Sequence, residues 1–404
     1  MTDVVVTGVG VVSAAGPSFD DLADALRQGR SCASPFATAL PLEEVAAVPS
    51  PVAPLAQFVD DRKAWLALDA LDQALADSNG TGEGTVSVFL GTGLSSVTPM
   101  ELNQDAYPFL TEDGTAFDRD ALCADLRSEG ASPWRHDPVR VTTEVANRVG
   151  ATGPCGTSFS ACSAAAQAIA EGVRTIRRGE ADVAIVGGHD SMLHPFGLLS
   201  FIVLGALSPS ACRPFDVHRD GFLIGEGAAI LVLESAEHAR NRGARVRARL
   251  LGAGTSVDGY AATAPHPEGA GAERAMRAAL RDAGLDGAAV DYVNAHATGT
   301  PVGDIAEAAA ISRVAPNAPV SSIKGAIGHT IAAAGAIEAA ACIAALEGGW
   351  MPGTVGLLEK DPACPVDAIA DTRNQAPRVI LSNSFGFGGQ NAALVLAHAE
   401  GNLV

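Results

Sequence analysis

Basic side chains are scarce in this sequence, and their scarcity excludes several classes of protein. The chain has 27 lysines and arginines against 46 aspartates and glutamates, which gives a formal net charge of −19. This balance argues against nucleic acid as a partner, because phosphate binding requires a basic surface. It also repels acidic proteins, so an acidic partner would need a local group of cations.

Paired cysteines and long apolar runs are also missing. The seven cysteines are odd in number and include no CxxC pair, which argues against a disulfide scaffold and a zinc site and favours a reducing cytoplasm. The sequence has no basic secretory leader and no uninterrupted apolar run of about 18 residues. We therefore expect a cytoplasmic protein with neither a signal peptide nor a membrane span.

The apolar content is sufficient for a large core. At 404 residues and 48% hydrophobic composition, the chain suits two domains or one large duplicated unit. Helical segments alternate with apolar strands such as 181–188, which predicts an α/β fold with parallel strands. Segment 100–138 is polar and gives no clear pattern, and it could be a loop-rich insertion or an interface.

Two glycine-containing strands suggest an internal repeat. The first, Val5–Gly10, contains Gly8-x-Gly10 but has Ser13 where a dinucleotide fingerprint requires its third glycine, so we expect no nucleotide site there. Residues 249–254 show the same glycine spacing. This weak echo suggests that the second half of the chain repeats the first.

Cys162 stands where a short extended segment meets an alanine-rich helix. Gly153-Pro154 interrupts the chain before it, and the helix runs to a basic last turn and Gly179. Unpaired N–H groups and the helix dipole at this point favour the thiolate and could hold an oxyanion. The alternative is a small buried cysteine with no chemical role.

Two histidines in the second half follow strand-like segments. His296 follows the strand-like segment 290–295, and sites in α/β sheets collect just past the carboxyl ends of strands. His329 follows a segment that includes Lys324 and starts an alanine-rich helix, whose dipole disfavours the imidazolium. Each histidine could instead be a structural residue, and Lys324 could be a surface lysine.

A glycine-rich loop, 383–391, lies between two apolar segments and exposes backbone N–H groups. Together with an active cysteine and two neutral histidines, such a loop suits an acyl-transfer and decarboxylation reaction. The thiol would carry an acyl thioester, and the histidines would stabilise an enolate formed by loss of CO2. A Cys–His hydrolase fits less well, because it lacks a role for the Lys324–His329 pair.

The chain resembles the β-ketoacyl-acyl carrier protein synthases of the thiolase superfamily, and among them most closely the synthase II type. The resemblance covers nearly the whole chain. It is carried by four motifs in the family's order: Ser160-Ala161-Cys162-Ser163, Asn294-Ala295-His296-Ala297-Thr298-Gly299-Thr300, Lys324-x-x-x-Gly328-His329 and Asn383-Ser384-Phe385-Gly386-Phe387-Gly388-Gly389.

The resemblance implies a role for each matching residue. Cys162 accepts the acyl chain, and His296 and His329 promote decarboxylation of the malonyl thioester. The backbone N–H groups of Cys162 and Phe387 form the oxyanion hole. Lys324 supports the histidines and pairs with Glu307. The contacts to substrate and phosphopantetheine are assigned to Thr298, Thr300, Phe385 and Phe387.

The resemblance also implies a fold, a reaction and partners. The fold is the duplicated five-layer α-β-α-β-α thiolase fold, with an N-terminal half at 1–245 and a C-terminal half at 246–404. The reaction is decarboxylative Claisen condensation in fatty-acid or type II polyketide elongation, including polyene assembly. Substrates arrive on the phosphopantetheine of an acyl carrier protein, without a metal or other cofactor. The implied assembly is a homodimer or a heterodimer with a chain-length-factor-like subunit.

Acidic carrier proteins require cations near the site, and Arg62 and Lys63 match the family's carrier-docking position. The bland alternative is that they offset Asp60 and Asp61 on a solvated face. Two rival functions remain: a non-catalytic chain-length factor, which would lose the nucleophile, and a coenzyme A thiolase or thioester hydrolase. Cys162 with both histidines disfavours the first, and the His296/His329/Lys324 set disfavours the second.

Overall fold

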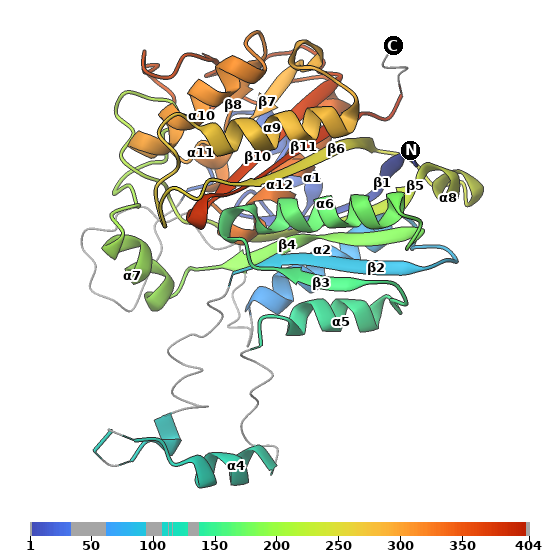
Figure 1. The fold of residues 1–404 in the computed structure, drawn as a ribbon, viewed down its shortest axis with the longest axis vertical. Coiled ribbons are helices and arrows are strands. Elements are labelled where there is room, and N and C mark those ends of the chain that lie inside the picture. The colour runs from blue at the N-terminus through green and yellow to red at the C-terminus, as the bar shows by residue number, and fades with distance from the viewer. Residues whose placement is uncertain are drawn as a thin grey trace.

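A computed structural model describes residues 2–33, 62–93, 107–111, 113–114, 116–127 and 137–400. The elements in these ranges form alternating layers of helices and strands (Figure 1). The strands of the N-terminal half are β1 (Val4–Ser13), β2 (Val86–Thr92), β3 (Cys155–Ser158), β4 (Val183–Ser191) and β5 (Glu226–Ser235). Those of the C-terminal half are β6 (Ala248–Val257), β7 (Tyr292–Asn294), β8 (Pro319–Ser321), β9 (Asp367–Ala368), β10 (Val379–Gly386) and β11 (Gln390–His398).

The order of the strands repeats. Hydrogen bonding gives β3-β2-β4-β5-β1-β6-β11-β10-β7-β8-β9. Counted outward from the β1–β6 contact, the first half has the order β1-β5-β4-β2-β3 and the second has β6-β11-β10-β7-β8, with β9 added at the edge. The two orders are identical when β1 is matched with β6, β2 with β7, β3 with β8, β4 with β10 and β5 with β11. The duplicated α/β fold expected from the sequence is confirmed.

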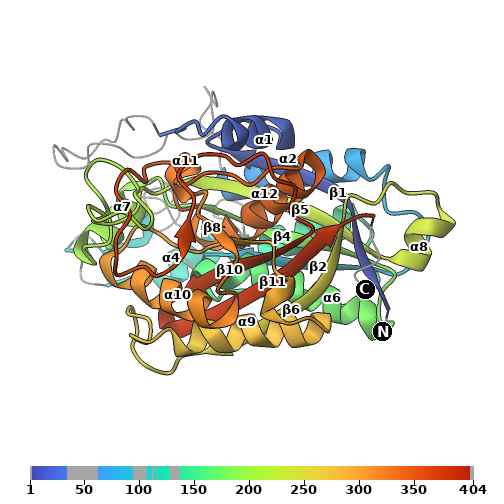
Figure 2. The ribbon, with the colours of Figure 1, turned by 90° about the horizontal axis from the view of Figure 1, so that it is seen from above.

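Two alanine-rich helices form the central layer. Helices α6 (Ala164–Arg177) and α12 (Ala334–Gly348) pack against each other and against strands of both halves (Figures 1 and 2). Helices α2 (Arg62–Asp77) and α5 (Arg140–Arg148) cover one outer face, and α9 (Ala270–Ala283) and α10 (Pro301–Val314) lie on the other. The remaining helices are α1 (Phe19–Arg27), α4 (Arg119–Arg127), α7 (Pro195–Val203), α8 (Ala236–Asn241) and α11 (Lys324–Ile327), with short 3-10 turns η1 (Tyr107–Phe109), η3 (Ala161–Ser163), η4 (Gly287–Ala289), η5 (Ile331–Ala333) and η6 (Phe387–Gly389).

The repeated glycines have the same packing role in both halves. A Cβ on Gly10 of β1 would lie 1.9 Å from the carbonyl oxygen of Ala70 in α2. A Cβ on Gly254 of β6 would lie 2.2 Å from the carbonyl oxygen of Ala275 in α9. Each strand thus has glycine where a helix backbone packs directly on it. The Gly8-x-Gly10 pair is therefore a site of close packing between β1 and α2.

Helix α12 belongs to the core. The segment Ile331–Gly348 is long and apolar enough to cross a membrane by length and composition alone. However, 89% of it is buried inside the protein. Its apolar character therefore reflects its position between the two halves, where every side of the helix meets protein.

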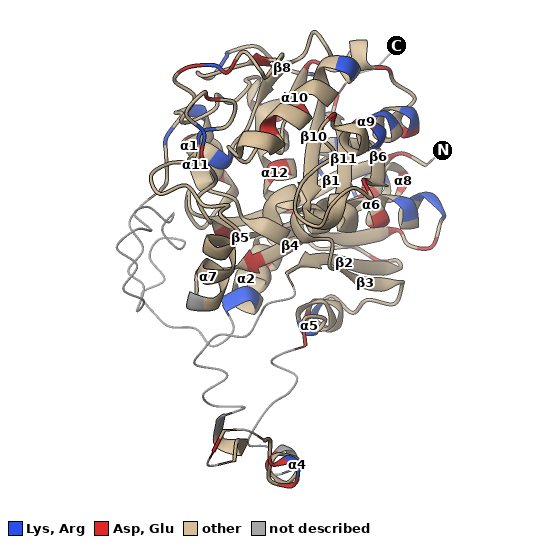
Figure 3. Cartoon of the chain, turned by 60° about the vertical axis from the view of Figure 1, so that its left-hand side comes forward, with Lys and Arg blue, Asp and Glu red and all other residues tan. Residues whose placement is uncertain are grey.

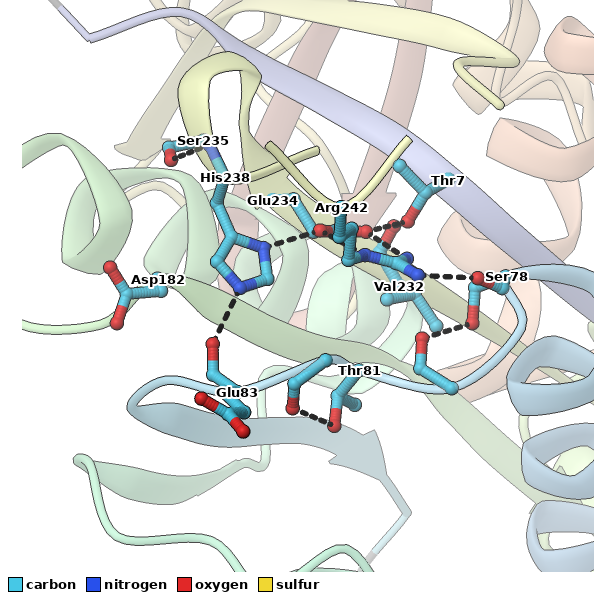
Figure 4. A network of polar contacts seen from close by, with 12 residues as sticks. Thr7, Ser78, Thr81, Glu83, Asp182, Val232, Glu234, Ser235, His238 and Arg242 are labelled. Carbon is cyan, nitrogen blue, oxygen red and sulfur yellow. Dashed lines mark hydrogen bonds and ion pairs between the residues drawn. The ribbon is translucent and has the colours of Figure 1, made fainter. Parts of the chain in front are cut away.

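A network of polar contacts lies at the C-terminal end of β5 and joins this strand to β1 and to α8 (Figure 4). The carboxylate of Glu234 is fully buried and accepts hydrogen bonds from the Thr7 hydroxyl and from Arg242, whose Nε lies 2.8 Å away. The Nδ1 atom of His238 lies 2.6 Å from the same carboxylate, and Arg242 also donates to the Ser78 carbonyl at 2.9 Å. Burial raises the pKa of Glu234, but these donors outweigh it and leave that pKa below its usual value.

Two expectations fall partly or wholly outside the described residues. Segment 100–138 contributes only η1, α4 and a few flanking residues to the description. Asp60 and Asp61, the acidic neighbours of Arg62 and Lys63 in the sequence, also lie outside, and α2 is described from Arg62. The division expected at 245/246 falls between α8 and β6, and we keep it as a proposal.

Candidate active site

Cys162 lies in the tight turn η3, directly before the central helix α6. The residue before it, Ala161, has a φ of 49°, in the left-handed region that alanine rarely adopts. The turn is fixed by the Ser163 hydroxyl, which donates to the Ser160 carbonyl at 2.8 Å. The extended segment and the helix expected around Cys162 are both present, as β3 and α6. The strained turn points to a constrained position for the cysteine.

Both predicted histidines lie beside this cysteine. The Nε2 atom of His329 is 3.1 Å from the Cys162 sulfur. The ring of His296 lies 5.3 Å from the ring of His329 between centroids, at 84°. His296 follows β7, and the His329 backbone is held by a 2.7 Å hydrogen bond from its N–H to the Leu223 carbonyl. The two histidines therefore reach the sulfur from two different loops of the second half.

Burial sets the protonation states of these groups. It lowers the pKa of His296 and of His329 well below the ordinary value, and the Lys324 ammonium lowers both further, so the imidazoles are neutral. Burial also raises the pKa of the Cys162 thiol to about 12, although Lys324 acts in the opposite direction. The pKa of Cys162 therefore shifts in the direction opposite to that expected from its place at a helix start, because loss of water around the sulfur is the largest cause.

Lys324 pairs with Glu338, and not with Glu307 as the resemblance implied. Its ammonium contacts the Glu338 carboxylate, and both side chains are only 2% exposed. Burial raises the pKa of Glu338, and the lysine lowers it. Glu338 was missed in the sequence, although it is the only charged residue between 331 and 346. A single carboxylate within such an apolar helix was the signal available.

Glu307 instead holds the backbone that carries His296. Its two carboxylate oxygens accept hydrogen bonds from the N–H groups of His296 and Ala297, at 2.8 and 2.7 Å, and Oε1 also accepts one from the Asn383 side chain at 3.0 Å. Burial raises the pKa of Glu307 to about 7, against these donors. Glu307 therefore does not form the ion pair expected with Lys324, whose ammonium contacts Glu338 in α12.

The glycine loop lies against the cysteine turn. Gly386 has no space for a side chain, because a Cβ there would lie 3.1 Å from the Cys162 nitrogen. The Phe387 backbone N–H donates to the Cys162 sulfur and favours its charged form. Gly388 and Gly389 have φ values of 76° and 69°, which glycine adopts without strain. The N–H groups predicted for the oxyanion hole are therefore adjacent.

A cavity of about 330 Å³ joins these groups. The threonine hydroxyls of Thr298 and Thr300 lie 3.1 Å apart in its lining. The predicted site residues that line the cavity are Cys162, His296, Thr298, Thr300, Glu307, His329, Phe385 and Phe387. The cavity thus brings together residues from positions 162 to 387, whereas Lys324 is buried and is not part of its lining.

Arg62 and Lys63 do not form the free group of cations expected for carrier docking, although the start of α2 is coloured as Lys and Arg in the ribbon of Figure 3. The Lys63 ammonium is 2.8 Å from the Asp190 carboxylate, and its side chain is 7% exposed. Arg62 Nε lies 2.5 Å from the fully buried carboxylate of Glu226. The docking role expected for this pair is corrected, because both cations neutralise buried carboxylates at the ends of β4 and β5.

Comparison with protein families identifies matches in both halves. The N-terminal domain model of β-ketoacyl synthases matches residues 1–239, and the C-terminal domain model matches residues 247–358. A putative polyketide beta-ketoacyl synthase 1 from Streptomyces cyaneus is 37% identical, with 98% of each chain covered. A 3-oxoacyl-[acyl-carrier-protein] synthase 2 from Staphylococcus aureus strain N315 is 36% identical and covers 83% of this chain and 80% of its own.

Solved structures with the same fold have similar sequences over their whole length. One is a type II PKS acyl-carrier protein in complex with its ketosynthase bound to the hexaketide; it has a TM-score of 0.88 and 29% identity, over 99% of this chain and 100% of that chain. The ishigamide ketosynthase/chain length factor has a TM-score of 0.82 and 33% identity over the same shares. Both likenesses extend across the cavity and the central helices.

Proposed function

The chain belongs to the β-ketoacyl synthase family, and on that premise we propose how its own residues carry out the condensation of a β-ketoacyl-acyl carrier protein synthase. One observation carries the proposal. A buried thiol lies 3.1 Å from a neutral imidazole, in a cavity that a second neutral imidazole also lines. This arrangement serves both acyl transfer to sulfur and stabilisation of an enolate.

In the first step, the Cys162 sulfur attacks the carbonyl carbon of a carrier-bound acyl thioester. The thiol proton leaves to the Nε2 atom of His329, which is within hydrogen-bond reach. The backbone N–H groups of Cys162 and Phe387 stabilise the negative oxygen of the tetrahedral intermediate. When this intermediate collapses, the carrier thiolate leaves and takes the proton, and the acyl group remains on Cys162.

In the second step, a malonyl thioester loses CO2 and its electron pair becomes an enolate. Neutral His296 and His329 donate N–H hydrogen bonds to the enolate oxygen, His329 after a change of tautomer that moves its proton to Nε2, and these bonds stabilise the developing charge. Thr298 and Thr300 bind the phosphopantetheine arm that carries the malonyl group. The Lys324–Glu338 pair, buried behind the histidines, lowers the pKa of both imidazoles through the lysine and keeps them neutral.

In the third step, the enolate carbon attacks the acyl carbonyl on Cys162 and a carbon–carbon bond forms. The oxyanion returns to the same two N–H groups, and the Cys162 thiolate leaves and takes a proton from solvent, which balances the carboxylate charge lost as CO2. The product is a β-ketoacyl group on the carrier, two carbons longer than the acyl group that entered. These steps need no electron acceptor or metal, and we propose that phosphopantetheine-linked substrates are sufficient.

We further propose that an acyl carrier protein delivers the substrates and that the chain assembles as a homodimer or with a chain-length-factor-like subunit. Two likenesses support this: a ketosynthase with its carrier protein and a ketosynthase with its chain length factor. Strand β3 ends the described sheet and its Cys155 is exposed, so it offers an edge for pairing with a second subunit. The seven free cysteines agree with a cytoplasmic location.

Intact-protein mass spectrometry tests the proposal. Wild-type protein is offered a panel of acyl-carrier thioesters that differ in chain length and saturation. We expect a single acyl adduct that maps to Cys162, and its yield identifies the preferred chain. Cys155→Ala is the matched control and should load normally, because Cys155 is exposed and does not line the cavity. An adduct that persists in Cys162→Ala would overturn the assignment of the nucleophile.

A further inference from the structure

The side chains of Cys162, His296 and His329 are also arranged as metal ligands are. Among the residues that the structure describes, one group of three or more His, Cys, Asp or Glu side chains converges as a metal site does: Cys162, His296 and His329. The three ligand atoms lie within 4.8 Å of one another, and all three residues are buried. From this geometry we propose that the cavity lined by these residues is also an inhibitory binding site for a soft divalent cation such as Zn²⁺ or Cd²⁺.

The distances suit such an ion. Zinc bonds to thiolate sulfur at about 2.3 Å and to imidazole nitrogen at about 2.0–2.1 Å, so ligand atoms in a tetrahedral site lie roughly 3.5 Å apart. The 3.1 Å separation between His329 Nε2 and the Cys162 sulfur is close to this value, and every pair among the three ligand atoms is within 4.8 Å. The open cavity supplies the fourth position, to water or chloride.

The charges select soft cations. Both imidazoles are neutral, so each has a free lone pair for a metal. The cysteine enters as a thiol, and a metal that binds it displaces one proton to solvent, M²⁺ + Cys–SH giving Cys–S–M⁺ + H⁺. The Lys324 ammonium repels cations, but Glu338 offsets it within the same buried pair. Ions that prefer carboxylate oxygen gain nothing from this donor set, whereas thiolate and imidazole favour zinc and cadmium.

The surroundings indicate reversible inhibition and not a resident cofactor. In permanent sites the second ring nitrogen of each histidine ligand donates to a carboxylate or carbonyl. Here the buried Nδ1 atoms of both His296 and His329 have no hydrogen-bond partner among the described residues. Without these partners the ion binds more weakly and a chelator removes it. Acyl loading uses the same sulfur, so metal and acyl group exclude each other.

The inference does not depend on the proposed reaction, and metal binding is measured without it. The starting protein carries Cys32→Ser, Cys123→Ser and Cys155→Ser, because these three thiols are not buried. Cadmium is titrated by calorimetry and by the ultraviolet charge-transfer band of the cadmium–sulfur bond. We expect one equivalent per chain, release of one proton, and recovery of the free protein with a chelator.

Two comparisons decide the matter. His329→Ala and Cys162→Ser should each weaken cadmium binding by more than about tenfold, the loss that outer-shell changes already cause. Cys342→Ala is the matched control, since Cys342 is a buried thiol of α12 that does not line the cavity, and it should bind one equivalent normally.

Alkylation provides a test in which no ligand residue is mutated. The starting protein, in which the three unburied cysteines are already serine, should lose the equivalent of cadmium when it is alkylated at Cys162 with iodoacetamide, and cadmium should in turn slow alkylation of Cys162, read by mass spectrometry. Stoichiometric binding that survives alkylation, or the absence of saturable binding in the unalkylated protein, would overturn the inference. Neither result bears on condensation, so the metal site and the proposed function can fail separately.

Discussion

The two halves of the molecule contain the same turn, and only one of them is reactive. In the first half, Ala161 with a φ of 49° leads through η3 into α6. In the second half, Ile331 with a φ of 48° leads through η5 into α12. We call these residues, 160–163 and 330–333, the first and second junctions. Cys162 of the first junction corresponds to Ala332 of the second.

The backbone N–H groups at the two junctions have different environments. At the first junction, Gly386 leaves the Cys162 N–H beside the cavity. At the second, the Ala332 N–H donates to the Asp190 carboxylate at 3.2 Å, and Lys63 neutralises that carboxylate. Both junctions can therefore bind a negative group, and the second is permanently occupied by one from the chain itself. The comparison shows that both junctions have the same backbone turn, and that they differ in what lies next to the N–H group. At the first junction it is the cavity, and at the second it is the Asp190 carboxylate.

Replacing the nucleophile makes the two junctions alike and has the largest expected effect. Cys162→Ala should abolish acyl loading and condensation while leaving the thermal unfolding curve close to that of the wild type, because the change removes one sulfur atom beside a cavity. Condensation assays and intact mass measure the first effect, and calorimetry the second. A variant that still elongates an acyl thioester would contradict the proposed mechanism.

Removing the carboxylate of α12 tests the buried pair that serves the first junction. Glu338→Gln leaves Lys324 buried and unpaired, and such changes cost about 3–5 kcal/mol in the free energy of unfolding. Urea unfolding measures the loss. The control is the double variant Lys324→Met/Glu338→Gln, which should recover most of the stability but not the activity. If Glu338→Gln were as stable as the wild type, the pair would not hold the site.

The corresponding pair at the second junction should affect stability alone. Lys63→Met leaves Asp190 buried without its cation, at a cost of about 3 kcal/mol, and Lys63→Met/Asp190→Asn should recover most of it. Because Lys63 is buried, the KM for carrier-bound substrate should not change in the double variant. A several-fold rise in that KM with normal stability would restore Lys63 as a docking residue.

The two histidines beside Cys162 separate acyl loading from decarboxylation. His296→Ala and His329→Ala should each slow decarboxylation by about 100- to 1,000-fold, the usual cost of removing one donor to developing charge. Loading should suffer less, because it depends mainly on the sulfur and the backbone N–H groups. CO2 release and self-acylation are measured separately. Equal losses in both would show that the histidines do not divide the reaction in this way.

A histidine next to Asp190 gives the smallest effect. Burial lowers the pKa of His189 to about 3, and neither ring nitrogen has a hydrogen-bond partner in the described part of the chain. Below pH 6.5 the unfolded chain binds a proton at this residue and the folded chain does not, so stability falls as pH falls. His189→Gln removes that term. Relative to wild type it should gain about 1.4 kcal/mol per pH unit between pH 6 and 4, measured by urea unfolding; a constant difference would contradict burial of a neutral His189.

The sequence predicted those parts of the site that depend on local pattern. Cys162, His296 and His329 follow recognisable strand and turn signals, and the glycine echo predicted the duplication. It could not predict pairing across the fold. Glu307 and Glu338 are both carboxylates on helices facing one region, and only packing decides that Lys324 turns to Glu338. The predicted direction of the Cys162 pKa shift was wrong for a similar reason, because burial by segments distant in the sequence raises that pKa.

The occupied second junction has a consequence for protein engineering. It already has the left-handed turn, the central helix and an N–H group that holds a carboxylate. A designer who wants a second acyl-accepting centre in this scaffold therefore needs no new backbone. The starting point is Ala332→Cys together with Lys63→Met/Asp190→Asn, which removes the carboxylate now bound there and its counterion.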